Sequence, residues 1–171
     1  HPQDLSQELT DAIAKYTRYG GKILILADLA AEAQRIYSPV NKRLTPSAFN
    51  GLNTLWGFDF NPNVTIADLD NSITVNTGSK KRSSFVQDII QFTINKDGIN
   101  QTQKETKYLS QFLFASATPI MPLPKHSSTF IPLLITSANS ALLPSAVVYE
   151  NVNPIDILPQ FKSDDSQKII A

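Results

Sequence analysis

The first twenty positions place their hydrophobic residues at the spacing of an α-helix. Leu9, Ile13 and Tyr16 fall on one helical face, after a capping candidate at Asp4 or Ser6. Serine and aspartate favour helix N-termini because their side chains accept a hydrogen bond from a free backbone amide. Two glycines follow and supply a stop. The pattern therefore predicts a helix that ends just before the glycine pair.

A short apolar run comes directly after the glycines. Residues 23–27 read Ile-Leu-Ile-Leu-Ala between Lys22 and Asp28. A continuous apolar run of this length is typical of a strand that is buried on both faces. Helix, glycine turn and buried strand make half of a parallel α/β unit, so we expect a mostly parallel sheet.

Further along the chain, apolar runs alternate with turn-forming segments. The pattern predicts helices over residues 29–36, 46–57 and 155–158, and strands over residues 64–67, 73–75, 89–94, 112–115, 130–136 and 146–149. Residues 127–149 carry no charge, but they include Pro132 and Pro144. Buried strands joined by turns explain that stretch better than a transmembrane helix does.

Composition sets the class of the protein. A chain of 171 residues with 42% hydrophobic and 18% charged residues predicts a single globular domain over residues 1–171. Fifteen basic residues balance fifteen acidic ones, which argues against nucleic acid as a partner. The absence of cysteine excludes disulfides and thiolate chemistry. Because the chain begins at His1 and not at a methionine, we expect a fragment of a longer protein.

Catalytic and metal-binding patterns are weak throughout. The two histidines are His1 and His126, and no G-x-S-x-G elbow presents a serine nucleophile. Asp68 opens a possible calcium loop, but Ile73 stands where that loop requires glycine. The six glycines form no phosphate-binding motif. We therefore predict no catalytic residue, no cofactor and no metal.

One polar group remains as a candidate ligand site. In open α/β sheets, ligands bind beyond the carboxyl ends of the strands. Asp28 follows the apolar run, and Thr136, Ser137 and Asn139 follow the run before residue 136. These four residues are candidates for lining a polar crevice. The alternative, which we favour, is that they cap helices and hold turns.

Several segments, in order, resemble the auxiliary subunits of gliding-motility-type ABC transporters. They are residues 1–6, residues 20–28, residues 52–58, residues 132–137 with their Leu-Leu-Ile-Thr-Ser sequence, and residues 168–171. The family's strand ends in Asp-Pro, whereas Leu29 follows Asp28 here.

The resemblance implies a three-layer flavodoxin-like or glutamine-amidotransferase-like α/β fold without the amidotransferase nucleophile. The first strand of that sheet would precede His1, so the fold would lack it here. The resemblance also implies a non-enzymatic scaffold on the periplasmic, extracytoplasmic face of the bacterial inner membrane. Its partners would be an ABC permease and its ATPase, and its membrane anchor would lie outside this chain.

Two alternatives stay open. One is a small-molecule or glycan-binding domain that uses the crevice near Asp28 and Ser137. The other is an unusual hydrolase that uses Ser137 or Ser127 as nucleophile with His126 as base.

Overall fold

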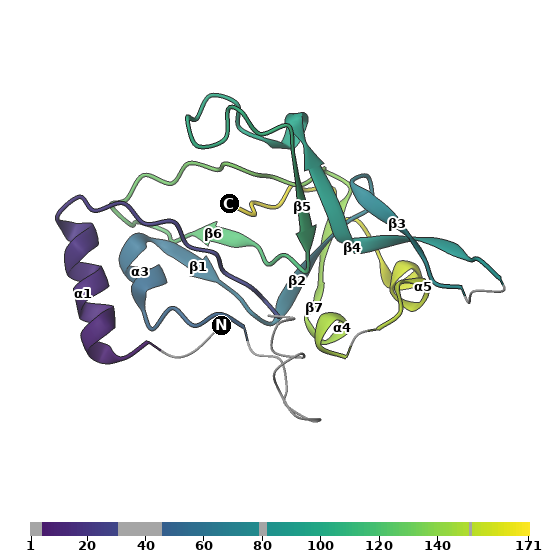
Figure 1. Cartoon of the computed structure of the whole chain (residues 1–171), viewed down its shortest axis with the longest axis horizontal. Helices are drawn as coiled ribbons and strands as arrows, with labels where there is room; N and C mark the ends of the chain where they lie inside the picture. Colours follow the sequence, from purple (N-terminus) through teal and green to yellow (C-terminus); the bar gives the residue numbers. More distant parts are fainter. Residues whose placement is uncertain (1–4, 31–45, 79–81, 151) are drawn as a thin grey trace. The chain divides into compact units, whose positions relative to one another are not determined.

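The computed structural model describes residues 5–30, 46–78, 82–150 and 152–171 (Figure 1). The chain divides into two compact units. Unit 1 is His1–Phe60 with Met121–Phe130, and unit 2 is Asn61–Ile120 with Ile131–Ala171. The prediction of one domain over residues 1–171 stays a prediction. In the described residues, no helix is both long enough and apolar enough to cross a membrane.

Unit 1 contains one helix of twelve residues and several shorter elements. They are α1 (Gln7–Arg18), α3 (Leu52–Trp56), β1 (Phe58–Phe60) and β6 (Ile120–Pro122), whose first residue belongs to unit 2. Strands β1 and β6 pair in a two-stranded sheet.

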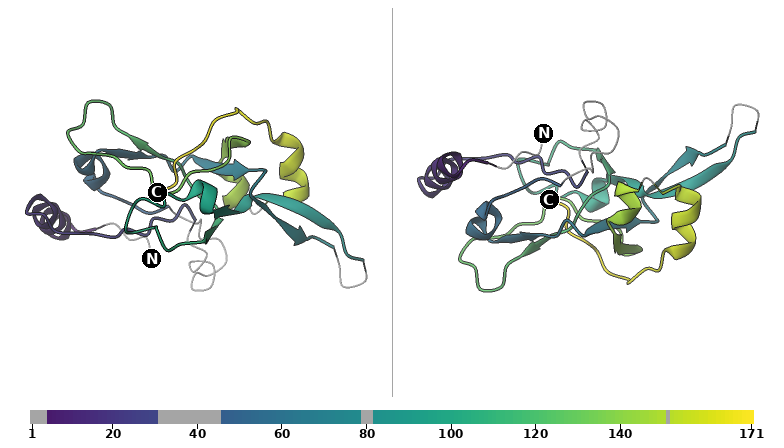
Figure 2. Two further views of the ribbon diagram at one scale, coloured as in Figure 1. Left: turned by 90° about the horizontal axis from the view of Figure 1, so that it is seen from above. Right: turned by 90° about the horizontal axis from the view of Figure 1, so that it is seen from below.

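Unit 2 contains the other strands and four short helical segments. They are β2 (Val64–Asp68), β3 (Ser72–Asn76), β4 (Phe85–Asn95), η1 (Lys96–Gly98), β5 (Gln111–Ala115), β7 (Ser140–Pro144), α4 (Ala146–Tyr149), α5 (Pro154–Ile157) and η2 (Leu158–Gln160). Strand β2 pairs antiparallel with β7, and β3, β4 and β5 form an antiparallel sheet in that order. Figure 2 shows β3 and β4 as a hairpin that extends beyond the helices of this unit.

The predicted fold class is therefore wrong. The structure has small, mostly antiparallel sheets, not a parallel three-layer flavodoxin-like or amidotransferase-like sheet. Parallel neighbours need a crossover of a dozen or more residues, usually a helix. In unit 2 the described helices α4 and α5 have only four residues each. They are too short to carry such a crossover.

The first predicted helix is confirmed as α1. The Ser6 hydroxyl accepts a hydrogen bond from the Leu9 amide at 3.2 Å, which satisfies a free donor of the first turn. Tyr19 is the C-cap, and Gly20 follows with a φ of 82°. Glycine adopts this left-handed conformation without a steric penalty, so it ends the helix cleanly.

The strand predicted over residues 23–27 is wrong. The segment has no strand partner among the described residues, and it is exposed instead of buried. Leu24 and Leu26 are each 86% exposed, while Ile23 and Ile25 are 42% and 41% exposed. The apolar run has the composition of a buried strand, but no described sheet takes it in. The helix predicted over residues 29–36 lies largely outside the described residues.

A small aromatic cluster organises the second half of unit 1. The Phe49 ring packs edge-on against Phe58 at 5.4 Å and lies 5.1 Å from Phe60. The Trp56 indole stacks on Phe58 and donates a hydrogen bond to the Thr17 hydroxyl at 3.2 Å. The helix predicted from residue 46 is shorter than expected, because it begins only at Leu52.

Gly57 ends α3 at a position where an added side chain would collide with the imidazole ring of His126. Its φ is 90°, and a Cβ atom there would lie 2.3 Å from His126 Nδ1. We expect Gly57→Ala to lower the free energy of unfolding by about 2 kcal/mol, from backbone strain and overpacking together. Gly51→Ala is the matched control, because Gly51 has a φ of 83° but open space around it.

Urea denaturation of both variants separates the two causes. The strain alone acts in Gly51→Ala, so that variant loses about 1 kcal/mol. Adding His126→Ala to Gly57→Ala removes the clash and recovers the difference. Equal losses in the two single variants would mean that the His126 contact costs nothing.

In unit 2 most strand predictions are confirmed. Strands β2, β3, β4 and β5 cover the predicted segments, and β4 is longer than expected. Two predictions are wrong. Residues 146–149 form helix α4, and residues 130–136 contain only isolated bridges, from Leu134 to Ile99 and from Ile135 to Ile169.

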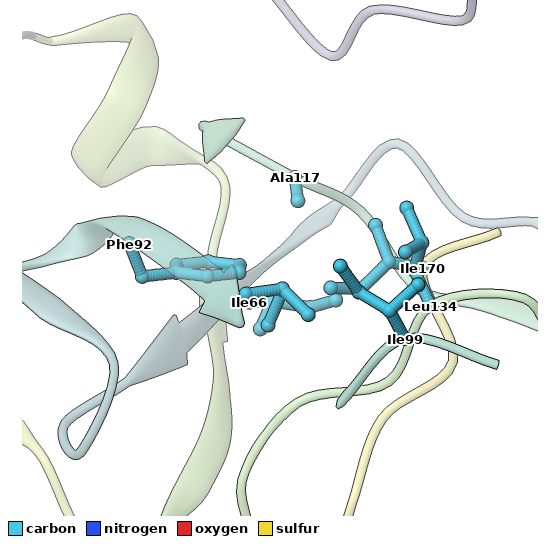
Figure 3. Close-up of a cluster of buried hydrophobic side chains, with 7 residues drawn as sticks. Ile66, Phe92, Ile99, Ala117, Leu134 and Ile170 are labelled. Atoms are coloured by element: carbon cyan, nitrogen blue, oxygen red, sulfur yellow. The ribbon is translucent and has the colours of Figure 1, made fainter. Parts of the chain in front are cut away.

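The main core of unit 2 is a cluster of buried hydrophobic side chains (Figure 3). Ile66, Phe92 and Ile94 are all 0% exposed, and the cluster is completed by Ile99, Ala117, Leu134 and Ile170. These residues come from distant parts of the chain, so their burial ties β2, β4 and the C-terminal residues together. A second cluster contains Ala67, Ile89, Ile90, Leu143 and Ile157.

Candidate functional site

A buried polar cluster of unit 2 is centred on Asp68, the last residue of β2. Its side chain is 0% exposed. One carboxylate oxygen accepts from the Ser137 hydroxyl at 2.6 Å and the Asn71 amide at 3.2 Å. The other accepts from the Ser137 amide at 2.9 Å and Asn71 Nδ2 at 2.8 Å. Four donors thus replace the water that burial removes from the carboxylate. We call this group the Asp68 clamp.

Thr136, next to the clamp, is joined to the C-terminal residues. It is 1% exposed, and its hydroxyl accepts from the Lys168 amide at 2.8 Å. The same hydroxyl lies 2.9 Å from the Ser140 hydroxyl, which donates to the Ser166 carbonyl at 2.8 Å. Ser140 is the register partner of Asp68 in the β2–β7 pair. The sheet pairing therefore fixes the clamp and this hydroxyl network side by side.

The other two predicted crevice residues differ in their surroundings. Asn139 donates from Nδ2 to the Asp70 carboxylate at 2.8 Å, and its carbonyl accepts from the Leu69 amide at 3.1 Å. Asp28 belongs to unit 1, where its carboxylate accepts from the Ala30 amide at 2.9 Å. Thr136, Ser137 and Asn139 thus share one cluster, and Asp28 belongs to another. Binding of a ligand to these residues stays a prediction.

Asp164 makes an ion pair with Lys168 at the edge of this network. Lys168 Nζ donates to its carboxylate at 2.5 Å. This hydrogen bond, helped by one from the Ser166 hydroxyl, holds the pKa of the Asp164 carboxyl below its ordinary value of 3.8. Asp164 stays half exposed, with 50% of its side chain accessible. The pair therefore orders the turn around Ser166, with the Lys168 side chain only 10% exposed and the Asp164 carboxylate still reached by solvent.

The geometry limits the chemistry of the predicted site residues. The Ser137 hydroxyl donates to a carboxylate instead of to a histidine base. His126 accepts on Nδ1 from the Ser128 amide at 3.1 Å. Among residues 5–30, 46–78, 82–150 and 152–171, no three His, Asp or Glu side chains gather as a metal site. Both Asp68 oxygens face hydrogen-bond donors, which is the arrangement of a turn clamp.

A protein-family model described as an ABC-type uncharacterized transport system matches residues 1–171. The chain belongs to this family. Family membership makes it an auxiliary domain of an ABC-type transport system. No curated protein and no solved structure matches the chain.

Within this member of the auxiliary family, the sequence did not single out the residues that organise the cluster. The sequence pattern marks Asp68 only as a possible calcium ligand, and no motif marks Ser140 or Lys168 as a site residue. One signal was available, because Asp68 ends an apolar strand and Asn71 follows three residues later. An aspartate in that position commonly accepts from the backbone of the following turn. The partner Ser137 is 69 residues away, so no local pattern predicts it.

Proposed function

We propose that this auxiliary domain is a non-enzymatic scaffold on the extracytoplasmic face of the bacterial inner membrane. It binds the ABC permease of its transport system and, through that permease, works with the ATPase. It takes part in gliding motility where the host bacterium glides. The match of the family model to the whole chain is the observation that carries the proposal.

The polar clusters of unit 2 support a structural role for its buried groups. Among the described residues, every buried side-chain nitrogen and oxygen has a hydrogen-bond partner. The Asp68 clamp uses both oxygens of its carboxylate within the fold. Groups engaged in this way stabilise a surface that a partner protein can bind.

Co-purification tests the proposal. The full-length protein is tagged in its own bacterium, extracted from gently solubilised membranes, and its companions are identified by mass spectrometry. We expect an ABC permease and its ATPase to be recovered. Recovery of neither subunit, while an unrelated membrane complex survives the same extraction, would overturn the scaffold role.

A further inference from the structure

The exposed apolar segment of unit 1 has unused strand-pairing capacity. Between the Gly21 amide, which donates to Tyr16, and Asp28, no backbone group of residues 22–27 has a hydrogen-bond partner among the described residues. Figure 1 shows this segment as an uncoiled trace that leaves α1. Its side chains alternate in exposure, from 42% and 86% at Ile23 and Leu24 to 41% and 86% at Ile25 and Leu26. Alternation with a period of two is the mark of an extended strand.

One edge of this strand is already occupied. The Asp28 amide donates to the Ser47 hydroxyl at 2.9 Å, and the Asp28 carbonyl accepts from the Ser47 amide at 2.8 Å. Backbone N–H and C=O groups of successive residues in a strand point to opposite edges. Residues of the same parity as Asp28 therefore face the Ser47 edge. The free edge therefore carries the backbone N–H and C=O groups of Ile23, Ile25 and Ala27.

The charges at the two ends favour one partner for this edge. Lys22 precedes the apolar run and Asp28 follows it, and Lys22 forms no ion pair with a described residue. If two copies pair antiparallel about Ile25, each Lys22 lies opposite the Asp28 of the other copy. Parallel pairing in register would bring like charges together, which destabilises a sheet.

The free backbone edge and the charges of Lys22 and Asp28 favour the same pairing register. Pairing about Ile25 makes Ile25 opposite Ile25 a hydrogen-bonded pair, and makes Ile23 opposite Ala27 the next one. Only backbone groups of the free edge are then used, and the Ser47 contacts of Asp28 remain. A two-fold axis through Ile25 closes the assembly as a dimer.

We propose that residues 22–28 form an antiparallel strand pair with the same segment of a second copy of this chain. The pair gives the apolar run the hydrogen bonds and part of the burial that its sequence demands. This goes beyond the scaffold role, and it does not depend on which transport subunits the domain binds.

Single cysteines test the register, because the chain has no cysteine of its own. In the proposed pair the two Ile25 Cα atoms lie about 5.5 Å apart, within the range of a disulfide. Ile23 is the matched control, since it is 42% exposed compared with 41% for Ile25. Its own counterpart lies about 13 Å away along the strand, beyond disulfide reach.

Under mild oxidation we expect Ile25→Cys to form a covalent dimer and Ile23→Cys to remain largely uncrosslinked. Light scattering on the unmodified chain should show a monomer–dimer equilibrium. Lys22→Glu should lower the association constant about tenfold, and Lys22→Arg should leave it nearly unchanged. A monomer at all concentrations up to about 0.1 mM, a range in which weak strand pairs would be visible, would overturn the proposal. So would equal crosslinking at both positions, or a dimer insensitive to Lys22→Glu.

Discussion

Replacing Asp68 by asparagine is expected to lower the free energy of unfolding by about 3 kcal/mol, since each hydrogen bond to a buried charge contributes about 1.5–3 kcal/mol. The wild-type carboxylate accepts from four donors and is 0% exposed. An asparagine keeps the size but turns an N–H group toward donors from Ser137 and Asn71. Those donors then lose their acceptor in a place that water does not reach.

Asp70→Asn is the control for this change. Asp70 lies two residues further along, is exposed, and accepts one hydrogen bond from Asn139. Its replacement should cost no more than about 0.5 kcal/mol, as is usual for surface positions. Both variants are measured by urea denaturation at neutral pH. A similar small loss in the two variants would contradict the central place of the Asp68 clamp in unit 2.

Truncating Phe92 to alanine should destabilise the chain by about 3–5 kcal/mol, the usual range for a fully buried phenylalanine. Phe92 is 0% exposed in the main core of unit 2, and its ring lies 5.8 Å from that of Phe114. The change therefore removes the ring that β4 contributes to the core beside Phe114 of β5, and leaves a cavity. Because a domain of this size is stable by only about 5–15 kcal/mol, the variant should lie close to unfolding at 37 °C.

The same strand offers the control, Phe85→Ala. Phe85 is also in β4 but is 70% exposed. We expect its loss to change the unfolding free energy by less than about 0.5 kcal/mol. Thermal and urea unfolding of the Phe92→Ala and Phe85→Ala variants show whether the loss of stability depends on burial of the ring or only on the removal of a phenylalanine. If both substitutions lower the free energy of unfolding by the same amount, the assignment of Phe92 to the core is wrong.

Local sequence signals predicted local structure well. Ser6 and Gly20 set the ends of α1, and the short apolar runs within β3 and β4 marked both strands. The sheet topology was not predictable in the same way. The run of residues 23–27 has the composition of a parallel, doubly buried strand, but composition does not say whether a partner strand is present.

The candidate site shows the same division. Thr136, Ser137 and Asn139 lie in one cluster because they are neighbours in sequence. Asp28 was added by assuming a parallel sheet, and it belongs to the other unit. The long-range contact from Ser137 to Asp68 depends on the β2–β7 register, and a register is fixed by packing as well as by sequence pattern.

The proposed scaffold role requires that this domain binds transport subunits through its folded surface. Its most direct test is co-purification of the full-length protein as wild type, Asp70→Asn and Asp68→Asn, with the permease and ATPase quantified by mass spectrometry. We predict equal recovery with wild type and Asp70→Asn, and a loss with Asp68→Asn that follows its unfolded fraction. If the wild-type protein recovers neither subunit from gently solubilised membranes, the account is contradicted, and binding of a small molecule or glycan becomes the leading function.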